Sequence, residues 1–559
     1  MIFDHDVIVV GAGLAGMRAA LEAARSGADV AVVSKVHPVR SHSNAAQGGI
    51  NAALGEGDSW ESHAYDTIKG SDYLADQDAV EVMCEEAPND IIEFEHMGVI
   101  FYRNADGRLG TRAFGGASQA RTYFVGDITG QALLITLYDQ ILKAGVKVYE
   151  EWFGTTLFLE NGTCRGLVAL ELLTGELHLL RAKAVIDAAG GGGRLYEPST
   201  NALICTGDGY SLAYRAGAPL MDMEMVQYHP TTLAGSGFLM TEAARGEGAY
   251  LLDGNGERFL KQYAPTKMEL AARDVISRAE TKEIAAGHGV NGNVLLDLRH
   301  LGRDVILKKL PQIHEMALDY LGIDMIEKPV PVRPGMHYMM GGVKTDVNGA
   351  TSVPGLYAAG EVANVSVHGG NRLGANSLLD TIVFGRRSGK AAAAYVKSVT
   401  PSQGGDDLLR SEQARLQALL ARPYQGETYA HLRLDLATMM DQKVGVYRDE
   451  AGLLSALEQL AEFRKRYELV AVGDKGRVYN QALQFVLELG FLLDCGEAVI
   501  RGALLRKESR GAQARTDYPE RDDAQWLKHI LLTYRAGAEP DVSYLPVTIT
   551  RWKPEVRSY

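Results

Sequence analysis

The chain has 559 residues, and its 46% hydrophobic and 23% charged residues are typical of a globular protein with more than one domain. The formal net charge of −13 argues against a nucleic-acid partner, because phosphate binding needs a basic surface. The four cysteines stand far apart with no CxxC pair, so we expect no metal site and no disulfide framework.

The N-terminal residues predict a nucleotide-binding unit. Residues 7–10 form an apolar strand, the run Gly11-Ala12-Gly13-Leu14-Ala15-Gly16 opens an alanine-rich helix that ends near Ser26, and residues 29–33 form a second strand. In such a βαβ unit of the Rossmann kind, glycines let the backbone approach a pyrophosphate at the helix N-terminus. The second strand ends in Ser34-Lys35, not in the acid that often binds ribose, which weakens the case for NAD.

Later glycine motifs indicate that this unit is interrupted. An apolar strand leads into the glycines at 190–193, Asp208 follows in Thr206-Gly207-Asp208-Gly209, and a third motif ends in Gly360-Glu361. Because these elements lie so far apart, we expect an inserted capping domain at residues 233–335. It would lie between Thr231-Thr232 and a segment punctuated by prolines.

The C-terminal part has a helical pattern. Apolar residues recur every three or four positions between 406 and 502, and we expect one buried helix face formed by Leu453, Leu454, Leu457, Leu460 and Phe463. Residues 401–405 are the expected linker into these helices. The last segment, 515–559, mixes turns and short strands.

A histidine follows the nucleotide motif in a distinctive segment. His42 lies in Arg40-Ser41-His42-Ser43, and Ala46-Gln47-Gly48-Gly49 follows closely. Five later motifs each place polar residues in apolar or glycine-rich surroundings: Gln227-Tyr228-His229-Pro230-Thr231, Thr241-Glu242-Ala243-Ala244-Arg245-Gly246-Glu247-Gly248, Ala272-Arg273-Asp274-Val275, His337-Tyr338-Met339-Met340-Gly341-Gly342 and residues 368–378. In this order the segments resemble the succinate dehydrogenase and fumarate reductase flavoprotein subunits, over nearly the whole chain.

The resemblance implies a covalently bound FAD. In that family the histidine that matches His42 is bonded to the FAD isoalloxazine. The implied cofactor contacts are Gly11, Gly13, Gly16, Ser34, Lys35, His42, Gln47, Gly48, Gly49, Asp208, Glu361, Ser377 and Leu378. The predicted fold class is α/β, with a Rossmann-like FAD-binding domain (1–232 and 336–400), an inserted α+β capping domain (233–335), a helical domain (406–502) and a small C-terminal domain (515–559).

The resemblance also implies a dicarboxylate site. The family's substrate residues fall on His229, Thr241, His337 and Arg372. Histidine and arginine donate charge-assisted hydrogen bonds to carboxylates, and arginine adds a planar fork that lysine lacks. A four-carbon dicarboxylate with two anionic ends fits donors of these types.

The implied reaction is the interconversion of succinate and fumarate, with a hydride exchanged between substrate and flavin. Arg273 matches the family's proton-transfer residue. Arginine is a poor base in solution, so the assignment needs a supply of protons. Glu242 and Arg245 match a relay that would serve Arg273, and the alternative is that these two residues form a structural ion pair.

The resemblance implies further subunits. No stretch reaches the roughly 18 uncharged apolar residues of a membrane span. The first strand begins too early to leave room for a signal peptide. We therefore expect an iron–sulfur partner subunit and, indirectly, membrane-anchor subunits with a quinone, which would hold the chain peripherally at the cytoplasmic side of the cell membrane.

Two other functions stay open at this point. One is an L-aspartate oxidase, which shares the fold but holds FAD non-covalently, and the other is a flavin-binding electron-transfer module with no substrate. The physiological direction is also open, because Gln47 is typical of succinate dehydrogenases whereas residues 121–124 and 506–510 look nearer to fumarate reductases. Gln131 and Gln513 stand where relatives often carry histidine.

Overall fold

The computed structural model describes residues 1–557 and is built around a seven-stranded sheet. Strand β1 lies in its middle, in the order β6-β2-β1-β9-β8-β7, and β16 pairs with the end of β9. The pairs β6–β2, β2–β1, β1–β9 and β9–β16 are parallel, whereas β7, β8 and β9 form an antiparallel meander. The strands are β1 (Ile2–Val10), β2 (Val30–Ser34), β6 (Lys147–Glu150), β7 (Trp152–Glu160), β8 (Thr163–Glu171), β9 (Glu176–Asp187) and β16 (Leu356–Ala358).

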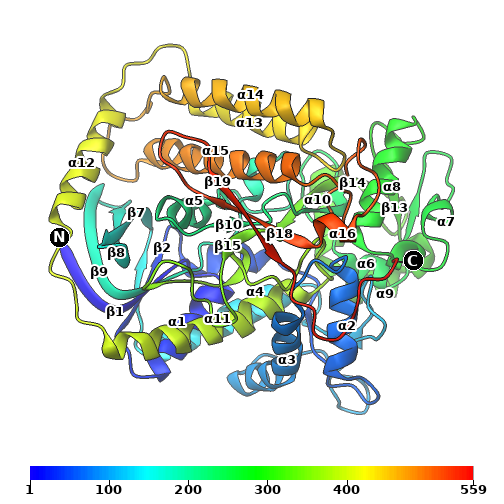
Figure 1. Cartoon of the computed structure of the whole chain (residues 1–559). Coiled ribbons are helices and arrows are strands. Elements are labelled where there is room, and N and C mark those ends of the chain that lie inside the picture. The colour runs from blue at the N-terminus through cyan, green and yellow to red at the C-terminus, as the bar shows by residue number, and fades with distance from the viewer. Residues whose placement is uncertain (558–559) are drawn as a thin grey trace.

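The predicted βαβ unit is present at the N-terminus. Valines and isoleucines at the centre of β1 and β2 are buried on both faces, as parallel strands covered by helices require. Helix α1 (Leu14–Arg25) packs against α11 (Asn376–Tyr395), and the two run side by side beneath the sheet in Figure 1. They approach so closely that a Cβ added at Gly389 would lie 2.2 Å from the carbonyl oxygen of Ala19.

A second sheet has four strands. Its order is β11-β14-β13-β12, all antiparallel, and its helices pack on it around a separate apolar core. The elements are β11 (Val226–Leu233), α6 (Glu242–Gly246), β12 (Tyr250–Leu252), α7 (Leu260–Tyr263), α8 (Arg273–Ala285), β13 (Val294–Asp297), α9 (Arg303–Lys309), α10 (Pro311–Leu321) and β14 (Val330–Met339). Residues 233–335, the segment expected to form the capping domain, contain these elements except most of β11 and the end of β14. The boundaries of that domain stay a prediction.

Four long helices follow the linker: α12 (Asp406–Ala421), α13 (Tyr429–Lys443), α14 (Glu450–Tyr467) and α15 (Gln481–Leu505). They share one apolar core with β7, β8 and β9, and α15 is buried nearly all round. The prediction for α14 was wrong at one position. Leu453, Leu460 and Phe463 are buried, but Leu454 is 47% exposed because it points about 100° away from Leu453 around the helix.

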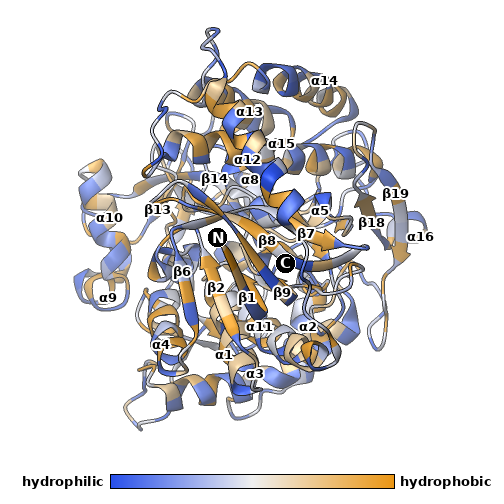
Figure 2. Ribbon diagram, turned by 90° about the vertical axis from the view of Figure 1, so that its left-hand side faces the viewer, coloured by the Kyte–Doolittle hydropathy of each residue, from blue (hydrophilic) through white to orange (hydrophobic). Residues whose placement is uncertain are grey.

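The C-terminal segment returns to the nucleotide-binding part of the molecule. Strand β18 (Lys528–Thr533) pairs with β10 (Leu220–Met221) on one side and with β19 (Asp541–Pro546) on the other. Figure 1 shows this red hairpin crossing the front of the molecule, and Figure 2 shows the hydrophobic strands β1, β2 and β9 at its centre. Within residues 1–557 no helix is long and apolar enough to cross a membrane.

The remaining elements complete the fold. They are η1 (Pro38–Arg40), η2 (His42–Ala45), β3 (Ile50–Asn51), α2 (Trp60–Gly70), α3 (Gln77–Met97), β4 (Thr111–Arg112), β5 (Thr122–Tyr123), α4 (Thr129–Lys143), η3 (Gly193–Leu195), α5 (Asp208–Arg215), η4 (Met268–Leu270), η5 (Arg299–Leu301), β15 (Gly342–Lys344), η6 (Gly360–Val362), β17 (Ala363–Asn364), η7 (Val396–Ser398) and α16 (Asp523–Trp526). All four cysteines are free and buried, and the described residues hold no cluster of metal ligands.

Candidate active site

One elongated cavity of about 1570 Å³, including the open solvent at its mouth, collects most of the predicted site residues. It begins at the glycine turn after β1, passes between α11 and the β9–α5 connection, and ends under the second sheet. The residues that line it include Gly11, Gly13, Ser34, Lys35, His42, Gln47, Gly48, Gly49, Asp208, His229, Thr241, Glu242, Arg273, His337, Glu361, Arg372, Ser377 and Leu378. Gly16 and Arg245 do not line it.

The glycine turn at one end is shaped by backbone contacts. Gly11 has a φ of 104°, and a Cβ there would lie 2.2 Å from the carbonyl oxygen of Ala188. Gly16, an expected cofactor contact, does not line the cavity. A Cβ at Gly16 would lie 1.9 Å from the carbonyl oxygen of Gly11, so this glycine allows the helix to pack on the turn. The N-terminus of α1 faces the cavity, where a helix dipole favours an anion.

A lysine and two carboxylates surround the end of β2. Lys35 Nζ lies 2.6 Å from Asp208 Oδ2, 2.8 Å from Glu488 Oε1 on α15 and 2.8 Å from Thr206 Oγ1. Burial lowers the pKa of Lys35, but the two carboxylates outweigh burial and raise it, so the ammonium stays charged. Sequence reasoning missed Glu488, because no local motif marks it and it lies 453 residues from Lys35.

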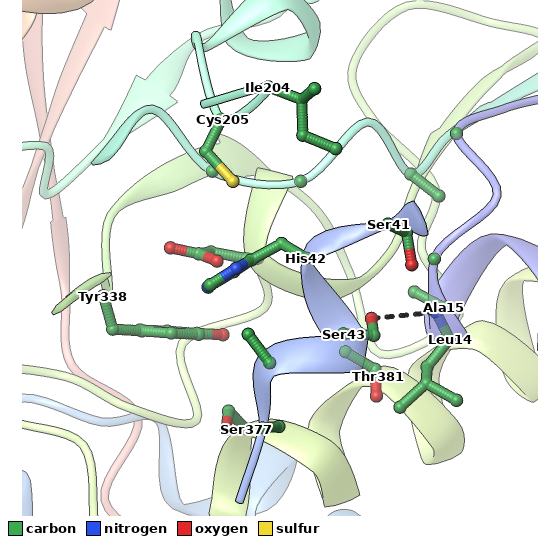
Figure 3. Close-up of a pocket in the computed structure, with 18 of the residues that line it drawn as sticks. Leu14, Ala15, Ser41, His42, Ser43, Ile204, Cys205, Tyr338, Ser377 and Thr381 are labelled. Carbon is green, nitrogen blue, oxygen red and sulfur yellow. Dashed lines mark hydrogen bonds between the residues drawn. The ribbon is translucent and has the colours of Figure 1, made fainter. Parts of the chain in front are cut away.

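His42 lies on the cavity wall with its ring pointing inward (Figure 3). Its Nδ1 accepts a hydrogen bond from the backbone N–H of Ala202 at 3.2 Å. The protein packed around the ring, together with the charge of Arg194, lowers the pKa of His42 to about 4. The ring is therefore neutral at pH 7, and with Nδ1 as acceptor its proton lies on Nε2.

Several polar groups along the wall fit a large polar cofactor. Among residues 1–557, Ser41 Oγ, Gln47 Oε1 and Arg372 Nε are buried without a hydrogen-bond partner, and all three residues line the cavity. Ser43 Oγ accepts from the Leu14 backbone N–H at 3.2 Å beside the glycine turn (Figure 3). FAD is a dinucleotide with a pyrophosphate and a flat ring system. It fits the length of the cavity, the glycine turn, the helix N-terminus and these polar groups.

Glu361 faces the cavity from the turn after β16. Burial raises the pKa of its carboxyl to about 7, although the Met339 backbone N–H donates to Oε1 at 3.0 Å. A Cβ at Gly191 would lie 2.3 Å from Glu361 Oε1, so a larger residue there would displace the carboxylate from its present position.

Two histidines from the second sheet meet at the far end of the cavity. His229 on β11 and His337 on β14 have ring centroids 4.9 Å apart. The backbone N–H of Thr231 donates to His229 Nδ1 at 3.2 Å, so the neutral ring carries its proton on Nε2. Burial, followed by the charge of Arg273, lowers the pKa of both rings well below the ordinary range.

Arg273, the first residue of α8, reaches two elements of this end. Its Nη2 lies 2.6 Å from Glu242 Oε2, and its Nη1 donates to Gln227 Oε1 at 2.9 Å. Gln227 in turn donates to Asn371 Oδ1 at 2.9 Å and to the Arg372 carbonyl at 2.7 Å. Gln227 therefore joins Arg273 to the loop of Arg372. It belongs to the sequence motif that contains His229, but the motif by itself does not indicate this role.

Arg372 is a buried cation that pairs with no carboxylate in the described part of the chain. Its guanidinium stacks on the Tyr338 ring, 4.5 Å from the centroid. Burial and repulsion by Arg273 lower the pKa of Arg372 to about 9. Thr241 caps α6 by accepting from the Ala243 N–H, which leaves its hydroxyl hydrogen for a ligand.

Arg245 lies behind Glu242, away from the cavity. Its Nη2 is 3.6 Å from Glu242 Oε2, and its Nη1 donates to the Glu269 carbonyl at 2.6 Å. Burial raises the pKa of Glu242, but Arg273 and Arg245 outweigh burial and lower it, so the carboxylate stays ionised. Arg273 and Arg245 thus share one carboxylate, and Arg372 adds a cation with no ion-pair partner in the described residues. The end of the cavity is therefore positively charged and suited to a dianion.

The two departures from the family pattern lie outside the cavity. Gln513 is fully buried, where Arg448 Nη1 donates to its Oε1 and its Nε2 donates to the Ala503 carbonyl at 3.0 Å. It therefore joins the C-terminal segment to α15 and to the connection between α13 and α14. Gln131 is in the first turn of α4, and no interaction explains a preference there.

The fold and this cavity define a flavoprotein with a nucleotide-binding domain. A family model described as FAD binding domain matches residues 6–378, and one described as fumarate reductase flavoprotein C-term matches residues 433–559. The fumarate reductase flavoprotein subunit of Mycobacterium tuberculosis is 47% identical, with 100% of both chains covered. The succinate dehydrogenase flavoprotein subunit of Rickettsia bellii is 45% identical, covering 99% of this chain and 97% of that one.

A solved structure of a variant Escherichia coli quinol fumarate reductase has a TM-score of 0.96 at 39% identity, covering 100% of this chain and 99% of that chain. The chain belongs to the family of succinate dehydrogenase and fumarate reductase flavoprotein subunits.

Proposed function

We propose that this chain is the flavoprotein subunit of a succinate:quinone oxidoreductase and interconverts succinate and fumarate with FAD bound covalently through His42. One observation carries the proposal: a neutral histidine and a cluster of arginines and histidines line the same cavity, which also has the glycine turn of a dinucleotide site. The relatives named for both reactions, at 45% and 47% identity, support it.

The charged end of the cavity would hold the substrate. Arg372 lacks a carboxylate partner within residues 1–557, and the Nε2–H of His229 is available as a donor. With His337 and the Thr241 hydroxyl, these groups would bind the two carboxylates of succinate or fumarate. Charge-assisted hydrogen bonds are worth roughly 1.5–3 kcal/mol each, so the set would hold a small, polar molecule.

FAD, when bound, would supply the exchange of a hydride with one carbon of the substrate. Arg273 would give a proton to the neighbouring carbon or take one from it. The ionised Glu242 lies 2.6 Å from Arg273 Nη2 and 3.6 Å from Arg245 Nη2, and it would pass the proton between these two arginines. Because the proton is replaced at once, Arg273 need never remain neutral in the buried site.

The partners and the location belong to the same proposal. We propose that two electrons pass to an iron–sulfur subunit and then to membrane-anchor subunits with a quinone, with this chain held peripherally on the cytoplasmic side. A solved relative at 39% identity is a quinol–fumarate reductase with menaquinol molecules, which supports a quinone as redox partner.

Flavin absorbance of the purified complex tests the reaction. Succinate should bleach the oxidised flavin, and fumarate should restore it, whereas L-aspartate should do neither. A flavin that succinate does not bleach would contradict the proposal and favour an electron-transfer module. Bleaching by L-aspartate would favour an aspartate oxidase.

The isolated chain tests the partner proposal. It should bind malonate or succinate, as flavin difference spectra would record, and yet reduce quinone at a small fraction of the rate of the complex. Rapid quinone reduction by the chain alone would show that no iron–sulfur subunit is needed.

A further inference from the structure

Helix α8 carries a second ionisable group on the face that bears Arg273. Arg273, Ser277 and Glu280 are four and three residues apart, so they lie on one stripe of the helix. All three are buried, and Glu280 has no exposed surface. Ser277 Oγ donates to the Tyr228 carbonyl at 3.2 Å, which turns this stripe toward β11 and the site.

Glu280 is buried without any hydrogen bond. Neither Oε1 nor Oε2 has a partner within residues 1–557, and it forms no ion pair there. The charge that acts on it is that of Arg245, whose Nε and Nη2 are also buried without a hydrogen-bond partner. Burial raises the pKa of Glu280 well above the ordinary range and Arg245 opposes this only in part, which favours the protonated, neutral form of the side chain.

A purely structural role explains Glu280 poorly. A buried carboxylic acid without a partner destabilises the fold, and an apolar side chain would fill the same space at no such cost. What Glu280 has that an apolar residue lacks is a proton, held in the interior beside the arginine that lies behind Glu242.

The next turn of α8 leads toward solvent. Glu283 is three residues further along, within the spacing at which helical side chains are neighbours. Its Oε1 accepts from Tyr263 Oη at 2.6 Å, and its Oε2 lies 2.6 Å from Nδ1 of His288, a side chain that is 53% exposed. A group that exchanges protons with water is thus about one turn from Glu280.

We propose that Glu280 stores the proton that recharges Arg273 through Arg245 and Glu242. The inference rests on the proposed function. In fumarate reduction, reduced flavin provides the hydride and Arg273 provides one proton to the other carbon. Arg245 then gives a proton to the ionised Glu242, which passes it to Arg273, and Glu280 gives its proton to Arg245, so Arg273, Glu242 and Arg245 end unchanged. The Glu280 carboxylate regains its proton from water by way of Glu283 and His288.

Two substitutions in the assembled complex separate this role from packing. Glu280→Gln keeps the shape and neutrality of the protonated acid but cannot release a proton, whereas Glu280→Asp keeps the acid and shortens the side chain. Glu412→Gln, at a buried carboxyl of α12 that does not line the cavity, is the control for the general cost of the change. The readouts are turnover in both directions, its solvent isotope effect, bound FAD, and malonate affinity from flavin difference spectra.

Glu280→Gln should lose about 100-fold in turnover, the lower end of the roughly 100- to 10,000-fold that proton transfer by a positioned side chain contributes. FAD content and malonate affinity should stay at wild-type values. Glu280→Asp should be more active than Glu280→Gln, with a larger solvent isotope effect than the wild type. If packing alone matters, Glu280→Gln should be more active than Glu280→Asp, because glutamine fills the space of Glu280 better than aspartate.

A Glu280→Gln complex with wild-type turnover would overturn the inference while leaving the proposed function intact. If Glu280→Gln does not assemble, the decision falls to Glu280→Asp, where an unchanged solvent isotope effect overturns the inference and a raised one supports it. A wild-type complex that interconverts no succinate and fumarate would instead overturn the proposed function.

Discussion

His42 combines a place on the cavity wall with an accepting Nδ1 and a ring that is neutral at pH 7. We predict that His42→Ser keeps FAD in place without the covalent bond. A histidyl substituent withdraws electrons from the flavin, so succinate oxidation should fall at least about tenfold, or ~1.4 kcal/mol of barrier, and fumarate reduction should fall less. The mass of the intact protein under denaturing conditions shows whether FAD is covalently attached. A wild-type mass equal to that of the bare polypeptide would contradict the covalent bond.

The two arginines at the charged end differ in what they contact. Arg273 is bonded to Glu242 and Gln227, whereas Arg372 has a free Nε and stacks on Tyr338. We predict that Arg273→Lys nearly abolishes turnover in both directions and keeps part of the dicarboxylate affinity, because an ammonium does not reproduce the guanidinium geometry. Arg372→Lys should weaken dicarboxylate affinity more than turnover. The guanidinium fork of Arg372 would hold a carboxylate in the ground state and in the transition state alike.

Malonate affinity and steady-state turnover, measured on the same preparations, decide between these roles. Substantial turnover by the Arg273 variant, with affinity lost in its place, would make Arg273 a binding residue only and leave the proton donor unidentified.

At the scale of elements, α10 joins the second sheet to the FAD side of the cavity. Asp127 Oδ2 accepts from the Gln312 backbone N–H at 2.9 Å in the first turn of α10, and Gln47 Nε2 donates to Gln312 Oε1 at 3.1 Å. Both contacts close the cavity between elements more than 180 residues apart in sequence. They therefore favour the conformation in which Arg273 lies over the substrate end.

We predict that Gln312→Ala raises the dicarboxylate KM by about two- to tenfold, the equivalent of one hydrogen bond of roughly 0.5–1.5 kcal/mol. Turnover should also fall, because a cavity that opens more often admits water. The control is Gln262→Ala, an exposed glutamine on α7. Equal kinetics for the two variants would show that the α10 contact does not hold the cavity closed.

At the scale of the whole molecule, His529 ties the C-terminal hairpin to the rest of the fold. It lies on β18, with Nδ1 2.6 Å from Asp222 Oδ2 and Nε2 3.3 Å from Asp76 Oδ1 at the start of α3. Burial lowers the pKa of His529, but the two aspartates outweigh it and raise the pKa to about 10. The imidazolium therefore joins three segments that are remote in sequence.

Since the folded-state pKa is above the unfolded value of about 6.5, the stabilisation is complete below pH 6.5 and is lost as pH rises toward 10. We predict that His529→Gln lowers the free energy of unfolding by roughly 3–5 kcal/mol at pH 6, as for a broken buried ion pair. The difference from wild type should shrink by pH 9.5. Urea unfolding at both pH values measures it, with the exposed His431→Gln as control. A difference that does not change with pH would exclude the charged pair as its cause.

Much of the fold was predictable because its signals are local. The apolar strand at 7–10, the glycine run after it and the alanine-rich helix specify the βαβ unit through side-chain size and backbone freedom, and the structure contains it as β1, α1 and β2. The resemblance also anticipated which residues line the cavity, with Gly16 and Arg245 as the exceptions. Leu454 shows the limit of a periodic pattern, since a count of spacings does not fix where the buried face ends.

The sequence by itself thus determined the elements, the family and most of the cavity's lining, because each depends on runs of neighbouring residues. Only the tertiary structure decided which polar groups complete the site. Gln227 meets Asn371 across 144 residues and Lys35 meets Glu488 across 453, and no local pattern encodes such a pair. The same holds for Glu280: its helix position is evident from sequence, but its lack of a partner and the charge of Arg245 acting on it arise only when α8 packs against the site.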